Sequence, residues 1–446
     1  MRRLLLLCLG AAACDVALVV GTGEERAAEG GAAGQGGGGA GESPSGEAGS
    51  KGEAGSSGDA GSSGDAGSGG GSGGNNDSGG APSAGAGGGQ GEPSCARPLI
   101  ATSVSAGEFH ACAVTPEDEI YCWGAGQAGQ LGNSDTVDTD YPVRVTSTKS
   151  FRRVTSLAVS TCALTSLSEL YCWGDNFDGV LGDETLNGTA APVLVRADVR
   201  YYAGRAASVI ALTTDDQVLA WGSNYYAQLG LGPASVGLAV HEPTVVTGFS
   251  AMHVSVGGKH SCLVDDLVQI FCTGDNLYGQ LAQPGDGRDT FGPIDGAVPL
   301  KDVHAGYERS CGLTAEGAVY CFGRNDDPVL IDGWPGVLTE PIQLGSEVGW
   351  DTISMGFWHV CLLRQGELYC LGRNDHGETG SQPAGDVTEP TRVGDVTYSL
   401  ISAGRDFTCA IRAEDSHLVC FGRNDTGQLG RTGAASPEPT PVCIPP

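Results

Sequence analysis

Basic residues are scarce in this sequence. The chain of 446 residues has 24 Lys and Arg against 53 Asp and Glu, which gives a formal net charge of −29. Proteins that bind DNA or RNA neutralise phosphates with clustered Lys and Arg, and beyond the N-terminus we find no basic run longer than Arg152–Arg153. The composition therefore argues against a nucleic-acid partner.

Long apolar runs are also missing. The run that begins at Leu4 is too short to span a bilayer, but two arginines before it and the small residues Gly10–Ala13 after it are typical of a signal peptide. Cys14 follows, so this end resembles a bacterial lipoprotein cleavage box, although Ala11 stands where such boxes usually have Leu. We predict a signal peptide over residues 1–14 with Cys14 lipidated. Plain secretion is the alternative, and a poorly ordered cytoplasmic N-terminus is a third.

Apolar side chains are nearly absent from residues 27–94, which are almost entirely Gly, Ala, Ser, Glu and Asp. Such a segment has too little to bury to offset the entropy of ordering it. We expect residues 15–94 to form a disordered linker, which serves as a tether or as a plain spacer. The folded part then covers residues 95–446.

Short C-x-x-C pairs, which a zinc site would need, do not occur either. Apart from Cys8 and Cys14, fourteen cysteines remain. Twelve of them form close pairs in the sequence, and the other two, Cys95 and Cys443, lie near the ends of the folded part. The close pairs are Cys112 with Cys122, Cys162 with Cys172, Cys262 with Cys272, Cys311 with Cys321, Cys361 with Cys370 and Cys409 with Cys420.

Each close pair flanks a turn-like centre with alternating apolar residues on both sides, which indicates a β-hairpin. The two cysteines are equidistant from the turn, so they face each other across antiparallel strands at disulfide distance. One hairpin has Ile210 and Ala220 in place of the pair, as expected when paired cysteines are lost together. We predict cross-strand disulfides and hence an oxidising compartment, with free buried thiols as the alternative.

The hairpins belong to a repeat. The stretch Glu169–Gly182, ELYCWGDNFDGVLG, is one of seven copies that follow one another at intervals of roughly fifty residues, which indicates a solenoid, propeller or array. Each unit reads as four short strands, which fits a propeller blade. The fifth unit has Asp327–Leu330 in place of the glycine-rich segment, so we expect that blade to be irregular.

The motifs are specific. Ala106–His110 (AGEFH), Gly129–Gly132 (GQLG) and Gly427–Gly430 (GQLG) resemble the regulator of chromosome condensation repeat. That resemblance covers the whole folded part and implies an all-β, seven-bladed propeller. A propeller must close its ring, so we expect the two end segments to meet and a disulfide between Cys95 and Cys443 to join them.

No catalytic constellation is apparent. His110, His260 and His359 occupy one repeat position that elsewhere holds Ser, Arg or Phe, which favours a turn or packing role. We find no Ser–His–Asp set, phosphate loop or H-E-x-x-H motif. The recurring asparagines, such as Asn176 and Asn224, are predicted to be turn residues. We expect no enzyme activity, no metal and no cofactor.

Aromatic residues are unevenly distributed among the connections. In a four-stranded antiparallel blade, the loops from strand one to two and from three to four share a face, and the hairpin turn lies on the other. Only the shared-face loops carry aromatic rings, which protein interfaces enrich. Packing onto neighbouring blades is the alternative, whereas Trp123, Trp173 and Trp221 are expected in the core. The candidate binding residues are Phe109, Phe177, Tyr225, Tyr226, Tyr278, Tyr307, Phe357, Trp358 and His376.

We therefore expect an exported, monomeric binding module of the cell envelope, with an unknown protein or a surface glycan as partner. Relatives of the repeat family include nucleotide-exchange factors for small GTPases and a secreted bacterial inhibitor of β-lactamases. Guanine-nucleotide exchange is one alternative, which export and acidity disfavour. An uncharacterised envelope enzyme is another. Fold alone does not decide between them.

Overall fold

The computed structural model describes residue 95 and residues 97–445, except 295, 297, 327–330, 332–335, 383 and 384. The predicted signal peptide, Cys14, the linker and the segment Asp327–Leu330 lie outside the described residues. No helix in the described part is long and apolar enough to cross a membrane.

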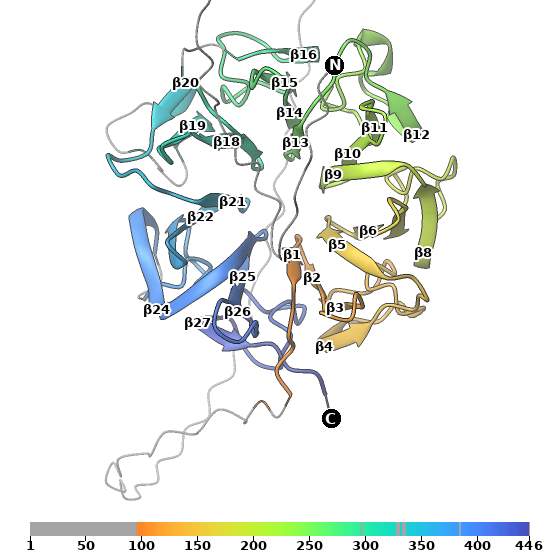
Figure 1. The fold of residues 1–446 in the computed structure, drawn as a ribbon, viewed down its shortest axis with the longest axis vertical. Coiled ribbons are helices and arrows are strands. Elements are labelled where there is room, and N and C mark those ends of the chain that lie inside the picture. The colour runs from red at the N-terminus through yellow and green to blue at the C-terminus, as the bar shows by residue number, and fades with distance from the viewer. Residues whose placement is uncertain are drawn as a thin grey trace, which may run out of the picture. The chain divides into compact units, whose positions relative to one another are not determined.

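Seven blades of four antiparallel strands surround a central axis (Figure 1). Each blade is a meander in which every strand pairs with the next. Blades 1 to 4 consist of β1 (Ser103–Ala106), β2 (His110–Val114), β3 (Ile120–Gly124), β4 (Thr139–Arg144); β5 (Phe151–Ser156), β6 (Ser160–Thr165), β7 (Leu170–Gly174), β8 (Thr189–Arg196); β9 (Val199–Arg205), β10 (Ser208–Thr213), β11 (Val218–Ser223), β12 (Ala239–Val245); and β13 (His253–Val256), β14 (His260–Val264), β15 (Ile270–Gly274), β16 (Arg288–Pro293).

Blades 6 and 7 share one strand. Blades 5 to 7 consist of β17 (His304–Ala305), β18 (Arg309–Leu313), β19 (Val319–Arg324), β20 (Val337–Gln343); β21 (Thr352–Met355), β22 (His359–Arg364), β23 (Glu367–Gly372), β24 (Val387–Ala403); and β25 (Phe407–Arg412), β26 (Leu418–Gly422), β27 (Ser436–Pro441). The first part of β24 pairs with β23 and its last part with β25, so these strands form one seven-stranded sheet. The only helix in the described part is the short 3₁₀ turn η1 (Pro233–Ser235).

The middle strands of each blade are covered on both sides. β2, β6 and β10 are buried at every residue, because their alternate side chains pack against the blade before and the blade after. The predicted core tryptophans tie blades together: the indole N–H of Trp123 donates to the Gln428 carbonyl at 2.9 Å, and that of Trp173 to the Gln130 carbonyl at 2.9 Å. Burial of Trp123, Trp173 and Trp221 is confirmed.

The predicted hairpin register is present in six blades, where each cysteine lies directly opposite its partner on the next strand. The six opposed pairs are Cys112 with Cys122, Cys162 with Cys172, Cys262 with Cys272, Cys311 with Cys321, Cys361 with Cys370 and Cys409 with Cys420. All six pairs are disulfide-bonded, with Cα atoms 4.0 to 4.2 Å apart, so the alternative of free buried thiols does not hold in this structure.

Blade 3 has the same hairpin without the disulfide. Its register places Ile210 opposite Ala220, at the positions that the two cysteines occupy in the other blades. Both side chains are completely buried. Two apolar residues therefore replace the disulfide in a hairpin that is covered on both sides.

The ring closes where the two ends of the folded part meet. The amide of Leu99 donates to the carbonyl of Val442 at 2.8 Å, and Leu99 is completely buried. The predicted disulfide between Cys95 and Cys443 is present beside this contact, with Cα atoms 5.8 Å apart. Cys443 lies just beyond β27, in a bridge with Pro98. Sequence positions 348 residues apart are thus joined at the closure.

The outermost strand of each blade pairs with a strand of its own blade on one side only, and a proline sits in each of these strands. Pro142 in β4 and Pro192 in β8 are examples, and proline removes a donor that would otherwise template pairing with another chain. The pairing between the third and fourth strands also shifts register next to the recurring glycine. In blade 1 the shift between β3 and β4 falls between Cys122 and Gly124. Gly124 has φ of 102°, and a Cβ there would lie 2.6 Å from the Phe109 carbonyl oxygen.

Candidate functional site

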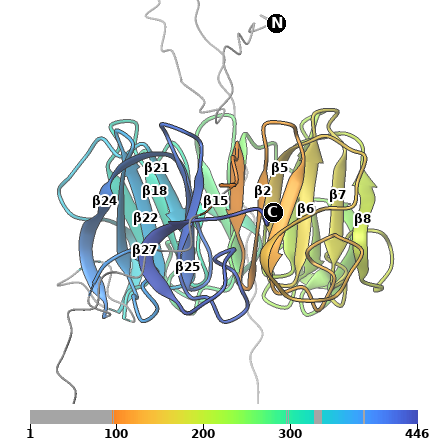
Figure 2. The same cartoon turned by 90° about the horizontal axis from the view of Figure 1, so that it is seen from below.

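One face of the ring carries the predicted binding loops. In blade 1 the amide of Ala125, which begins the β3–β4 loop, donates to the carbonyl of Phe109 in the β1–β2 loop at 2.9 Å. The equivalent bonds are Asp175 to Val159, Ser223 to Ala207, Asp275 to Lys259, Arg324 to Glu308, Arg373 to Trp358 and Arg423 to Asp406. We call this side the loop face and the side with the hairpin turns the turn face; Figure 2 shows the strands running between them.

Buried asparagines hold the outer loops in shape. The side-chain oxygen of Asn176 accepts from the Leu181 amide at 2.9 Å, and its amide nitrogen donates to the Thr185 carbonyl at 3.0 Å. These bonds confirm the predicted turn role, because the asparagine side chain bonds to backbone amides and carbonyls of the loop in place of a neighbouring strand. The same acceptor bond is made by Asn224, Asn276, Asn325, Asn374 and Asn424.

The nine candidate binding residues fall into three groups by exposure. Phe177 is 74% exposed, and Tyr225 and Tyr226 are about half exposed at 49% and 48%. Phe357 is only 6% exposed, so the expectation that it forms part of an open binding surface is wrong. The half-buried members are Phe109, Tyr278, Tyr307, Trp358 and His376.

Phe357 is buried because other rings and cations cover it. The ring of Tyr307 stacks on it with centroids 4.4 Å apart, and the guanidinium groups of Arg205 and Arg405 lie 5.2 and 5.5 Å from its centroid. Trp358 meets Tyr307 edge to face at 5.8 Å. The packing alternative therefore applies to the inner part of the loop face. It does not apply to Phe177 at the outer rim, and Tyr225 remains half exposed there.

Buried carboxylates pair with cations around the inner rings. Glu308, 5% exposed, accepts from Lys259 at 2.8 Å and from Arg324 at 2.9 Å. Lys259 also lies 5.3 and 5.6 Å from the ring centroids of Tyr226 and Tyr307. The sequence-based prediction missed these cations, although an alignment of the repeats shows Arg324, Arg373 and Arg423 at one shared position, directly after the recurring glycine.

The comparisons with known proteins agree with this geometry. Profiles of the Regulator of chromosome condensation (RCC1) repeat match residues 117–161 and 215–264 and, in a second form, 101–130, 300–327 and 398–428. The yeast protein Prp20p (Saccharomyces cerevisiae) has the same fold, with a TM-score of 0.65 and 22% identity over 74% of this chain and 87% of that one. Human WBSCR16 also has this fold, with a TM-score of 0.62 and 19% identity over 69% of this chain and 85% of that one.

This is an RCC1-like β-propeller. Among curated relatives, the Ultraviolet-B receptor UVR8 (Arabidopsis thaliana) is 27% identical over 49% of this chain and 52% of its own length. The E3 ubiquitin-protein ligase HERC2 (Homo sapiens) is 28% identical over 55% of this chain and 4% of its own. The chain thus spans about half or less of these proteins. The relatives support a protein-binding or regulatory propeller.

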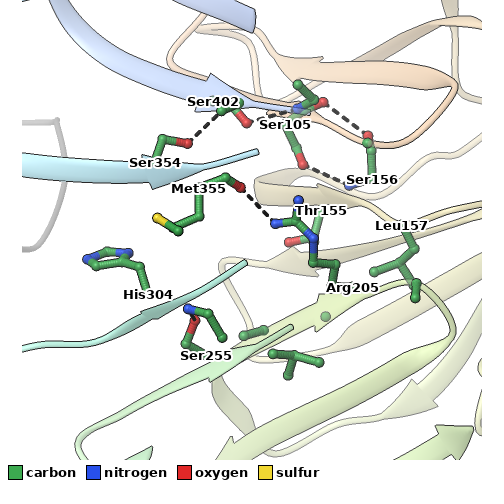
Figure 3. Close-up of a pocket in the computed structure, with 18 of the residues that line it drawn as sticks. Ser105, Thr155, Ser156, Leu157, Arg205, Ser255, His304, Ser354, Met355 and Ser402 are labelled. Atoms are coloured by element: carbon green, nitrogen blue, oxygen red, sulfur yellow. Dashed lines mark hydrogen bonds between the residues drawn. The ribbon is translucent and has the colours of Figure 1, made fainter. Parts of the chain in front are cut away.

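The axis of the RCC1-like propeller contains a cavity of about 260 Å³, lined by the innermost strands (Figure 3). Serine side chains join neighbouring blades around it: Ser105 accepts from the Ser156 amide at 2.8 Å, and Ser402 from the Ala106 amide at 2.9 Å. Arg205 crosses the cavity and donates to the Met355 carbonyl at 2.8 Å, as Figure 3 shows. Burial lowers the pKa of Arg205 to about 10.

Two histidines that sequence reasoning missed also line the cavity. His253 and His304 have ring centroids 6.0 Å apart, and the Tyr201 hydroxyl is hydrogen-bonded to His253 at 2.9 Å. Burial lowers the pKa of His253 to about 3, so it stays neutral. Among the described residues no group of three or more His, Cys, Asp or Glu could hold a metal ion.

The repeat-position histidines have packing roles. His110 is hydrogen-bonded to Thr161 of the next blade at 2.8 Å, and His260 and His359 contact Ser310 and Thr408 in the same way. Burial lowers the pKa of all three to about 3, so none can exchange a proton near neutrality. The predicted turn or packing role is confirmed.

Proposed function

We propose that this protein is an exported, non-catalytic binding module that recognises a partner protein, or a surface glycan, through the outer rim of its loop face. The observation that carries the proposal is the exposure of Phe177, Tyr225 and Tyr226 on that face. The turn face has no aromatic residue in its hairpin turns. Exposed aromatic rings that gather on one surface are typical of protein-binding sites.

Export is supported by the seven disulfides, which persist in oxidising compartments. A cytosolic GTPase partner would not meet such a protein, so guanine-nucleotide exchange is the weaker candidate. We further propose that a lipid on Cys14 anchors the chain to the envelope. Fatty-acid labelling that persists in a Cys14→Ser variant would contradict this anchor.

Affinity capture from envelope extract, with the full chain as bait, tests the binding module. The test variant carries Phe177→Ser and Tyr225→Ser. The matched control carries Leu167→Ser and Leu267→Ser, which remove two side chains that are 77% and 76% exposed on the turn face. A partner that is retained by the control and lost by the test variant supports the proposal. Capture of nothing, or equal loss in both variants, contradicts it.

A further inference from the structure

The loop face has two chemically different parts. The third residue after the recurring glycine of β3 and its equivalents lies near the tip of each outer loop. In blades 2 to 4 this position holds Phe177, Tyr225 and Leu277, whereas in blades 5 to 7 it holds Asp326, Asp375 and Asp425. We call the outer loops of blades 1 to 4 the apolar half and those of blades 5 to 7 the ion-paired half.

The apolar half carries apolar side chains that are more than half exposed, whereas its rings Tyr226 and Tyr278 are partly covered by Lys259 and Arg324. Phe177 and Leu277 are 74% and 71% exposed, and Leu186 and Leu238 are each more than half exposed. In the ion-paired half an arginine precedes each aspartate by two residues and bonds to it, as Arg324 does to Asp326 at 2.7 Å and Arg423 to Asp425 at 2.6 Å. The loop-tip aspartates of the ion-paired half are thus bonded to arginines of their own loops, whereas the loop-tip apolar side chains of the apolar half lie in water.

The charge of the apolar half has one sign. Its four loops, residues 125–138, 175–188, 224–238 and 275–287, contain eight acidic residues and no Lys or Arg. None of these carboxylates has an ion-pair partner within the described part of the chain. They are Asp135, Asp138, Asp175, Asp178, Asp183, Glu184, Asp275 and Asp286.

The apolar half is also one continuous surface. The outer loops of blades 1 to 3 are each bonded to the outermost strand of the next blade: Ser134 donates to the Ala190 carbonyl at 2.9 Å, and Glu184 to the His241 carbonyl at 3.0 Å. Gly232 makes the third such bond, at 2.8 Å. The buried asparagines fix the loops themselves. The exposed apolar side chains are therefore presented on a rigid support together with the four exposed carboxylates, Asp135, Asp138, Glu184 and Asp286.

We propose that the apolar half binds a segment of a partner protein in which apolar side chains alternate with Lys or Arg. This inference rests on the proposed binding function and names its footprint and partner chemistry. Apolar side chains of the partner cover the exposed rings and leucines, and its cations meet carboxylates that have no ion-pair partner among the described residues of this chain. A second copy of this chain is a poor occupant, since its net charge is −29.

Fluorescence anisotropy with labelled synthetic peptides and the full chain tests the partner chemistry. The probe alternates Lys with Leu; one matched peptide has Glu in place of Lys, and another has Ser in place of Leu. We expect the Lys–Leu peptide to bind at least about tenfold more tightly than either matched peptide. Equal affinity for the Glu peptide, or no binding of the Lys–Leu peptide, overturns the proposal.

Two variants locate the footprint. Phe177→Ser with Leu277→Ser removes apolar contact, and Asp135→Asn, Glu184→Gln and Asp286→Asn together remove three exposed charges. We expect each variant to weaken binding of the Lys–Leu peptide by about tenfold. The control neutralises three exposed carboxylates in hairpin turns and should weaken binding by less than about twofold. These control residues are Glu117, Glu316 and Glu414.

The outcomes separate this inference from the proposed function. An equal loss in the charge variant and in its control means that only net charge matters, and overturns the footprint. A captured natural partner that is lost by Phe177→Ser with Tyr225→Ser, but is a neutral glycan or presents no basic segment, leaves the binding module intact and overturns the inference. Failure to capture any partner contradicts the proposed function itself, whatever the peptides do.

Discussion

The apolar half and the ion-paired half of the loop face share a backbone and differ in chemistry. Both have the same glycine and the same bond between inner and outer loops, and the buried asparagine recurs in every blade except the first, which has Gly126. The difference begins one residue after the glycine, where the ion-paired half has Arg324, Arg373 and Arg423. The equivalent positions of blades 2 to 4 in the apolar half hold Asp175, Ser223 and Asp275.

The long arginine explains why some rings are covered. The guanidinium of Arg324 lies 4.9 Å from the ring centroid of Tyr278 in one neighbouring blade and 5.4 Å from that of Trp358 in the other. Asp175 and Ser223 are too short to reach a ring in this way, so Phe177 and Tyr225 stay exposed. Cations that reach a ring therefore help to cover it, Arg324 over Tyr278 and Trp358, and Arg205 and Arg405 over Phe357.

Removal of a packed aromatic ring should give the largest loss of stability. Phe357→Ala is expected to lower the free energy of unfolding by about 3 kcal/mol, because it leaves a cavity beneath Tyr307 and between two guanidinium groups. Guanidinium denaturation with the disulfides intact measures the change. Phe177→Ala is the matched control. If the two variants lose the same stability, the distinction between packed and exposed rings is wrong.

Loss of the buried carboxylate Glu308, in the inner loop of blade 5, should also lower the free energy of unfolding. Glu308→Gln leaves Lys259 and Arg324 without their shared partner, and both cations are about one-fifth exposed. We expect the free energy of unfolding to fall by about 2 kcal/mol. Asp326→Asn, in which the aspartate is half exposed, should cost less than about 1 kcal/mol. Equal effects would show that burial does not set the strength of these pairs.

A pH-dependent change in the free energy of unfolding is expected at Glu378. This residue is fully buried in blade 6, where blades 1, 3, 4 and 7 have Gln, and its Oε2 accepts from the His376 amide at 2.8 Å. Burial raises the pKa of Glu378 to about 7 from 4.5, with a smaller effect from Asp406. The folded state thus binds a proton that the unfolded state has already lost between these two pH values.

The sign of the effect follows from that proton. Stability falls as pH rises from 4.5 to about 7, because ionisation of Glu378 is disfavoured only in the folded state. Glu378→Gln should therefore be more stable than the parent by about 3 kcal/mol above pH 7, and no more stable below pH 4.5. Unfolding curves at the two pH values measure the difference. A gain that is independent of pH would contradict the shifted pKa.

The smallest stability effect is expected in the apolar half. Phe177→Ser with Leu277→Ser should change the free energy of unfolding by less than about 0.5 kcal/mol, since both side chains are largely in water. The same variant should lose most of its peptide binding. Thermal unfolding followed by circular dichroism is sufficient here. A large loss of stability would mean that these side chains pack on the propeller and are not a free surface.

Much of the fold could be read from local patterns. The hairpin register follows from cysteines placed equally far from a turn, and it fixes the pairing of Cys112 with Cys122 and of the five similar pairs. The replacement of a pair by Ile210 and Ala220 follows the same register. The contrast between Phe177 and Asp326 was also present in the sequence, at one position of the aligned repeat.

Exposure could not be read in this way. Phe357 and Phe177 are both aromatic residues in loops of the same face, yet one is buried and the other is not. The cover of Phe357 comes from Arg205 and Arg405, which belong to other blades and are far from it in the sequence. The sequence by itself determined the strands, their register and the disulfides, because these depend on neighbours along the chain. Only the closed ring decided which rings meet water, because that depends on side chains brought together across the axis.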